Sequence, residues 1–260
     1  MRQLGILHQL ARTGGTIINR CLGCMQATVM FSELHPGHTQ QGSFSPIQQA
    51  RQWFDLISAE EQTTLRALAL QDGPGGFVRT IELIEERTRR NGLHVLIREW
   101  SHADFIRTPN TKPVFRSRMV DVLGGMFALR RAAVVRHPLD QWRSMQDYPM
   151  SRERTSLADY LNGHRRFAEM AVEVGLVRYE DFCSEPAGTL QRLCSSLGIP
   201  FDPSFSERWV HYDRLTGDVG RPPKLPIRAR ERPPASERLI AEVLQSDDYR
   251  TSLALLGYPN

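Results

Sequence analysis

The stretch LGILHQLARTGGTIINRCLGCM, residues 4–25, joins a short apolar run to a periodic apolar segment through a turn that contains glycine. The run Leu4–Leu10 is typical of a buried strand, and the spacing in Ile17–Met25 is typical of an amphipathic helix. In RTGGT (residues 12–16), two glycines let the backbone turn tightly, so that successive N–H groups point into one concavity. Because a helix N-terminus and Arg12 both add positive charge, the sequence predicts a cradle for a phosphate or sulfate. The alternative is an ordinary strand-to-helix turn.

Further along the chain, segments typical of strands and helices alternate. Strands are expected over Thr28–Phe31, His94–Arg98, Ala132–Val135 and Gly175–Arg178. Helices are expected from Pro46, from Ser58 (with Glu61 completing a capping box), over 75–90, from Pro138, over about 155–174, over Glu185–Leu197 and from about 235. This alternation predicts a three-layer α/β fold with a central, mostly parallel sheet flanked by helices. No repeat or linker divides the chain, so residues 1–260 are expected to form one domain.

Five polar clusters each follow a predicted strand. They are Arg12–Thr16, Glu33–His35, Glu99–His102, Arg136–Ser144 and Tyr179–Asp181. Ligands of such sheets bind beyond the carboxyl ends of the strands, so we expect the clusters to meet at one edge. In the fourth cluster, Arg136 ends a strand and Ser144 lies near the second turn of the next helix. A guanidinium and a hydroxyl can then share one anion, although an arginine before a helix-starting proline also occurs without a ligand.

The overall composition excludes several classes of protein. Hydrophobic residues make up 40% and charged residues 24%, which excludes a mainly disordered chain. The net charge is +4 and the isoelectric point about 9.1, which fits an anionic ligand better than a large nucleic-acid surface. We therefore expect no nucleic-acid partner.

Neither a targeting segment nor a metal site is expected from the sequence. The apolar run before Arg12 is too short for a signal peptide, and no stretch approaches the roughly 18 apolar residues of a membrane span. Four cysteines, of which Cys21 and Cys24 form a CxxC, do not make a disulfide framework. No cluster has the spacing of metal ligands. These features predict a soluble, cytoplasmic protein without a metal.

Three motifs, in this order, resemble those of the PAPS-dependent sulfotransferases, a family with a P-loop-like strand–loop–helix at the N-terminus. The family pattern [K/R]-[S/T]-G-x-[S/T] is matched by RTGGT, and the pattern R-x-P-x-D…S is matched by VVRHPLDQWRS, which starts at Val134. A later YED segment followed by a P…L…L…LG helix is matched by RYEDFCSEPAGTLQRLCSSLGIPFD, residues 178–202. The resemblance spans residues from about 4 to 203, and arginine at position 12 resembles bacterial members.

The resemblance implies a binding site for the donor PAPS and its product PAP. It places the 5′-phosphosulfate on Arg12, Thr13, Gly14, Gly15, Thr16 and Ile17. It places the 3′-phosphate on Arg136 and Ser144, and the adenine near Tyr179. The segment 216–221 is the candidate for the loop that closes over the 3′-phosphate in the family. It is comparable to that loop only in being basic, and Arg221 is the candidate contact. The basic segment 221–232 is expected either to face the nucleotide or to form a solvated surface.

Two residues are candidates for the general base. In tyrosylprotein and heparan sulfate sulfotransferases a glutamate after the second strand activates the acceptor, and Glu33 stands at that place. His35 follows it by two, as in the heparan type. In the cytosolic branch the base is a histidine after the third strand, a place that His102 can fill, although its spacing from Arg98 is longer. The resemblance implies that Arg12 stabilises the leaving oxygen.

The reaction implied is transfer of a sulfuryl group from PAPS to a hydroxyl or amine, with release of PAP. The acceptor is a carbohydrate, peptide, lipid or small molecule, and the expected walls of its pocket are residues 36–50 and 100–118. One alternative is a P-loop-type phosphotransferase or kinase that uses ATP, although no Gly-Lys-Ser/Thr occurs in the chain. The other is a nucleotide-binding module without catalysis. The oligomeric state is left open.

Overall fold

A computed structural model describes residues 2–37, 42–107, 112–147, 155–216, 226–229 and 234–259. Its centre is a sheet of strand order β2-β3-β1-β4-β5, in which each neighbouring pair is parallel. The strands are β1 (Arg2–Gln9), β2 (Thr28–Leu34), β3 (His94–Glu99), β4 (Phe127–Val135) and β5 (Leu176–Arg178). The predicted α/β fold with a parallel central sheet is confirmed.

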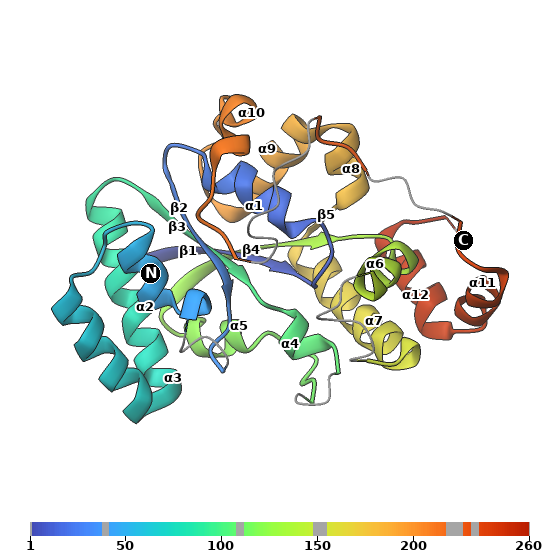
Figure 1. Ribbon diagram of the computed structural model, residues 1–260, viewed down its shortest axis with the longest axis horizontal. Helices are drawn as coiled ribbons and strands as arrows, with labels where there is room; N and C mark the ends of the chain where they lie inside the picture. The colour runs from blue at the N-terminus through green and yellow to red at the C-terminus, as the bar shows by residue number, and fades with distance from the viewer. Residues whose placement is uncertain are drawn as a thin grey trace.

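Helices cover both faces of the sheet (Figure 1). One face carries α1 (Gly15–Gly23), α8 (Tyr179–Ser184), α9 (Pro186–Leu197), α10 (Phe205–Arg208) and the short η2 (Trp209–His211). The other carries η1 (Gly42–Phe44), α2 (Pro46–Gln52), α3 (Ala59–Arg90), α4 (His102–Phe105), α5 (Arg118–Leu123) and α7 (Leu157–Val174). Beside α7 lie α6 (Pro138–Gln146) and α12 (Asp247–Leu256), and α11 (Glu237–Leu244) packs against α12. Among the helices described, none combines the length and apolar character needed to cross a membrane.

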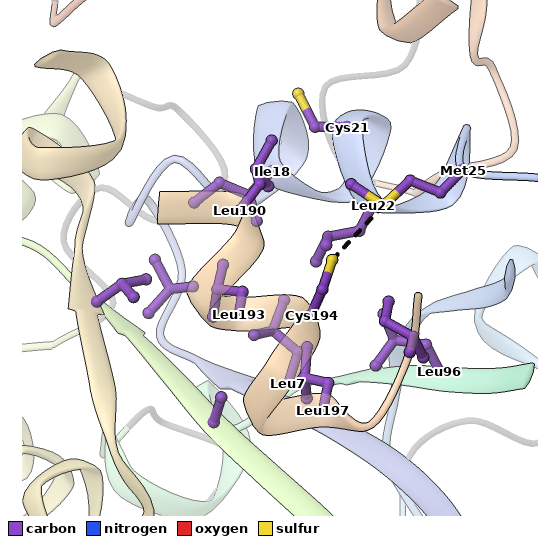
Figure 2. Packing of buried hydrophobic residues seen from close by; sticks show 14 of the residues in the cluster. Leu7, Ile18, Cys21, Leu22, Met25, Leu96, Leu190, Leu193, Cys194 and Leu197 are labelled. Atoms are coloured by element: carbon purple, nitrogen blue, oxygen red, sulfur yellow. Dashed lines mark hydrogen bonds between the residues drawn. The ribbon is translucent and has the colours of Figure 1, made fainter. Parts of the chain in front are cut away.

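The alternation of side chains along β1 divides the core between the two faces. Leu7 packs among α1 and α9, whereas Leu4 and Ile6 pack on the side of α3 and α5. Figure 2 shows the first of these layers, in which Cys194 of α9 points toward Met25, with 3.5 Å between their sulfur atoms. This packing holds α1 against the sheet. As a result, the loop between β1 and α1 lies at the carboxyl end of β1.

Several elements differ from the sequence-based expectation. The helices predicted from Ser58 and over 75–90 form α3, with a kink at Gly73 (φ 40°, ψ −105°) just before Pro74. They run together because apolar residues on both sides of the kink pack into one core. Strand β2 continues past its predicted end at Phe31 to Leu34, and β4 begins at Phe127, before its predicted start at Ala132. In both added stretches, polar side chains find partners elsewhere in the fold. The stretch after Pro203, expected to be irregular, contains α10 and η2, which bury Trp209.

His164 of α7 is buried in a way that predicts destabilisation by acid. Its Nδ1 lies 3.1 Å from the Ser252 hydroxyl, and burial lowers the pKa of His164 to about 4. In an unfolded chain the pKa of histidine is about 6.5, so between these values the unfolded state binds more protons. The free energy of unfolding should therefore fall as the pH is lowered from about 6.5 to about 4, by at most about 3 kcal/mol for this group.

Replacing His164 by glutamine should remove part of that dependence. We expect a smaller loss of stability between pH 7 and pH 4.5 for His164→Gln than for the wild-type chain, as measured by urea unfolding at both values. His94→Gln is the matched control, because His94 is exposed, and its pH dependence should equal that of the wild type. Equal slopes for all three proteins would contradict this origin of acid sensitivity.

Candidate active site

The loop between β1 and α1 is a concave turn of backbone. Arg12 (φ 68°) and Gly14 (φ 82°) both have left-handed backbone conformations, which turn their peptide groups toward one side. The Thr13 hydroxyl donates to the Leu10 carbonyl at 2.9 Å and so stabilises the loop from within. Gly14 is the N-cap of α1 and has no side chain to cap it. N–H groups at this helix start are therefore well placed for an anion.

The end of β4 and the start of α6 lie directly against this loop. Arg136 Nη1 donates to the Arg12 carbonyl at 3.1 Å, and Arg12 Nε donates to the Ser144 hydroxyl at 3.2 Å. The Arg136 guanidinium carbon lies 4.9 Å from the ring centre of Tyr179, and that ring faces Gly14. The structure thus brings together residues from three of the polar clusters that the sequence separates.

Arg136 is a buried cation that pairs with no carboxylate among the residues that the structure describes. It is 7% exposed, and within the described ranges it makes no ion pair. Its Nε, also buried, has no hydrogen-bond partner there. A buried charge and a buried unbonded donor are both costly. The arrangement fits an anion that accepts from this guanidinium.

Glu33 lies within β2 rather than after it. The register of β2 against β3 shifts between Phe31 and Leu34, and Glu33 has a left-handed φ of 54° at this bulge. Its Oε1 accepts from Arg98 Nη2 at 2.7 Å and its Oε2 accepts from the Thr216 hydroxyl at 2.6 Å. The Glu33 side chain is 16% exposed. Because an ionised carboxylate offers about four lone-pair sites, both oxygens can still take a proton.

A chain of contacts joins Glu33 to the loop before α1. With the Gln9 side-chain oxygen facing Arg98, it accepts from Arg98 Nη2 at 2.8 Å. The Gln9 amide in turn covers Gly15, since a β-carbon at Gly15 would lie 2.1 Å from it. Sequence reasoning missed Gln9 and Arg98 as parts of this site, and it considered Thr216 as the first residue of the candidate closing loop at 216–221 rather than as a partner of Glu33. The alternation of side chains along β1 and β3 was an available signal, because it places Gln9 and Arg98 on the same face of the sheet as Leu7 and Leu96.

Comparison with solved structures now bears on this geometry. The sulfotransferase domain from the curacin biosynthetic pathway superposes with a TM-score of 0.61 at 16% identity, over 100% of this chain and 99% of that one. The sulfotransferase domain from the Synechococcus PCC 7002 olefin synthase has a TM-score of 0.58 at 14% identity, over 84% and 78%. The chain has the sulfotransferase fold. No family model matches the sequence, and no curated protein matches it.

Within this sulfotransferase fold, His102 lies in a different environment from Glu33. It is the first residue of α4 and is 8% exposed, and its Nδ1 has no hydrogen-bond partner in the described part of the chain. Burial lowers the pKa of His102 to about 4. A histidine of such low basicity is a weaker proton acceptor at neutral pH than one near 6.5.

His35 and Glu99, which also belong to the clusters, are engaged in buried pairs. His35 Nε2 lies 3.1 Å from Asp104 Oδ1 in a buried pair. Glu99 is fully buried, with Oε2 2.5 Å from His8 Nδ1. Burial alone would raise the pKa of Glu99, but the charge of His8 and its hydrogen bonds with His8, Ser117 and Ser101 lower it to about 2. The two pairs lie at the ends of β2 and β3.

Some predicted residues lie outside the part of the chain that the structure describes. Arg221 is one of them, as is most of the basic segment 221–232. Parts of the two expected pocket walls, 38–41 and 108–111, are others. In the remainder of those walls, Phe44 stacks on Trp100 with 6.4 Å between ring centres. The backbone N–H of Trp100 donates to the Leu34 carbonyl at 2.9 Å.

Proposed function

We propose that this protein is a PAPS-dependent sulfotransferase that transfers a sulfuryl group to an acceptor hydroxyl or amine and releases PAP. The observation that carries the proposal is Arg136, a buried guanidinium without a carboxylate partner in the described ranges, placed against the concave loop of Arg12 and Gly14. The similarity in fold to two solved sulfotransferase domains adds support.

The residues present fit a donor nucleotide with two anionic ends. The loop Arg12–Ile17 would hold the 5′-phosphosulfate through backbone N–H groups and the Arg12 guanidinium. Arg136 and Ser144 would hold the 3′-phosphate, and Tyr179 would lie near the adenine. When bound, PAPS supplies an activated sulfuryl group. Arg12, 3.2 Å from Ser144 in the present structure, would turn to the charge that develops on the leaving oxygen.

Glu33 is the proposed general base. It has an exposed fraction large enough to meet an acceptor, and it is joined to the donor loop through Arg98 and Gln9. Arg98 and Thr216 each occupy one lone pair of the carboxylate oxygens, and Glu33 can take the acceptor proton on a remaining one. His102 stays the alternative base of the cytosolic branch, with the lowered pKa of about 4 against it.

Binding measurements separate this proposal from an ATP-dependent phosphotransferase. We expect PAP to bind with at least tenfold higher affinity than ATP when both are titrated by calorimetry, because the site offers two anion positions but no lysine of a P-loop. Tighter binding of ATP with magnesium would favour the phosphotransferase. Binding of PAP without turnover of any acceptor would favour a nucleotide-binding module.

Gly14 should be essential for the donor site. A β-carbon at this position would lie 2.2 Å from the Tyr179 ring, and the backbone is left-handed, so any side chain displaces the ring and strains the loop. Gly14→Val should abolish detectable PAP binding in a calorimetric titration.

Gly92→Ala is the matched control for Gly14→Val. Gly92 has φ +70° but nothing within 4 Å of its β-carbon position, so this variant carries the backbone cost alone, about 1 kcal/mol. Its PAP affinity should equal that of the wild type. Normal PAP binding by folded Gly14→Val would place the donor loop elsewhere.

A further inference from the structure

Thr216 reaches the proposed base from a distant part of the chain. It follows Glu33 by 183 residues, yet its hydroxyl lies 2.6 Å from Glu33 Oε2. Its backbone N–H donates to the Ser32 hydroxyl oxygen at 3.1 Å. Thr216 is 1% exposed, and these two contacts hold both its backbone and its side chain against the bulge of β2.

Counting donors and acceptors gives these hydrogen bonds a direction. The Ser32 oxygen accepts from the Thr216 N–H and from Arg98 Nη1 at 3.2 Å, which uses both of its lone pairs. Its own hydrogen is then available to the Thr216 hydroxyl oxygen, 2.9 Å away. Thr216 therefore donates its hydrogen onward to Glu33, as a carboxylate only accepts when ionised.

The Glu33 carboxylate is held from two sides as a result. Arg98 donates to one oxygen and Thr216 to the other. Arg98, on the neighbouring strand β3, and Thr216, from outside the sheet, therefore set the orientation of the Glu33 side chain. Arg98 also contacts Gln9 near the donor loop, whereas Thr216 makes its described side-chain contacts with Ser32 and Glu33.

We propose that Thr216 is a positioning residue for the general base: its hydroxyl orients the Glu33 carboxylate toward the acceptor without contacting the donor nucleotide. The inference rests on the proposed function, since it takes Glu33 as the base. It goes further by giving Thr216, the first residue of the candidate closing loop at 216–221, a role toward the base rather than toward the 3′-phosphate.

The test compares Thr216→Val with Thr216→Ser. Valine keeps the shape but removes the hydroxyl, so kcat should fall about tenfold, the lower end of the effect of one hydrogen bond to a charged group. Serine keeps the hydroxyl and should stay within about threefold of the wild type. The PAP affinity of both variants, measured by calorimetry, should remain within about twofold. Turnover is followed as PAP release from PAPS with an acceptor found by screening hydroxyl compounds.

Thr80→Val is the matched control. Thr80 is also 1% exposed, and its hydroxyl donates to the Gly76 carbonyl in α3, outside the site. This variant should keep full turnover. A crystal structure of Thr216→Val gives a readout that needs no acceptor, and it should show the Glu33 carboxylate rotated from its present position.

Several outcomes would overturn the assignment of Thr216. They are wild-type turnover in Thr216→Val, no recovery in Thr216→Ser, a parallel loss of PAP affinity, or an unmoved Glu33 carboxylate. The Glu33→Gln variant separates the two levels of argument. If it loses turnover while Thr216→Val does not, only the role of Thr216 fails. If Glu33→Gln turns over normally, the base assignment fails and the role of Thr216 with it.

Discussion

Replacing Glu33 by glutamine should lower turnover by about a hundredfold to ten-thousandfold, the range typical of the loss of a general base. Glutamine keeps the length and shape of the side chain, but its amide does not accept the acceptor proton. PAP affinity should change little, because in the described part of the chain Glu33 is joined to the donor loop indirectly, through Arg98 and Gln9. The measurements are kcat with a screened acceptor and calorimetric titration of PAP.

Two variants make this result specific. Glu85→Gln removes another buried carboxylate, one that pairs with Arg2 at 3.2 Å far from the loop, and it should leave turnover unchanged. His102→Asn should be mild. A severe loss at His102 with near-normal turnover in Glu33→Gln would instead indicate the mechanism of the cytosolic branch. Thermal unfolding of each variant shows whether it is folded.

The second large effect is expected at Arg136. Replacement by alanine should weaken PAP binding by about tenfold to a hundredfold, since a hydrogen bond to a charged group contributes about 1.5–3 kcal/mol. Without ligand, the variant should unfold at a temperature no lower than the wild type, because a buried cation with an unbonded Nε is costly to the folded state. Ser144→Ala should cost less, about 1 kcal/mol.

Arg130→Ala is the control for Arg136→Ala. Arg130 lies on β4, the strand that leads to Arg136, but it is exposed and donates to the carbonyls of Ser195 and Ser196. Its loss should leave PAP affinity unchanged. Unchanged affinity in a folded Arg136→Ala protein would rule out the assignment of the 3′-phosphate to Arg136.

The side chains packed against the loop before α1 predict that this loop is sensitive to substitution. Gly14 and Gly15 are each covered by a side chain, the Tyr179 ring and the Gln9 amide. Tyr179 also lies under Arg136, 4.9 Å from its guanidinium carbon. A change in the loop therefore displaces the two groups that connect it to the proposed 3′-phosphate site and to the proposed base.

Local sequence determined how strands and helices alternate along the chain, and it determined the loop that joins β1 to α1. Apolar periodicity, the capping box of Ser58 and Glu61 and the helix-ending Gly198 all act within a few residues, so they can be interpreted without the rest of the chain. The carboxyl ends of parallel strands meet at one edge, which is why the convergence of Arg12, Arg136 and Tyr179 could be anticipated.

Only the tertiary structure decided how the candidate base is held and which polar residues belong to the site. The bulge that places Glu33 within β2 depends on pairing with β3, and the donor on its second oxygen is Thr216, 183 residues away. Glu99 and His35 stand in similar sequence clusters but are enclosed in buried pairs. Neighbouring residues on a strand point to opposite faces of the sheet. Contacts between residues far apart in the sequence are set by the packing of whole elements, which no local pattern encodes.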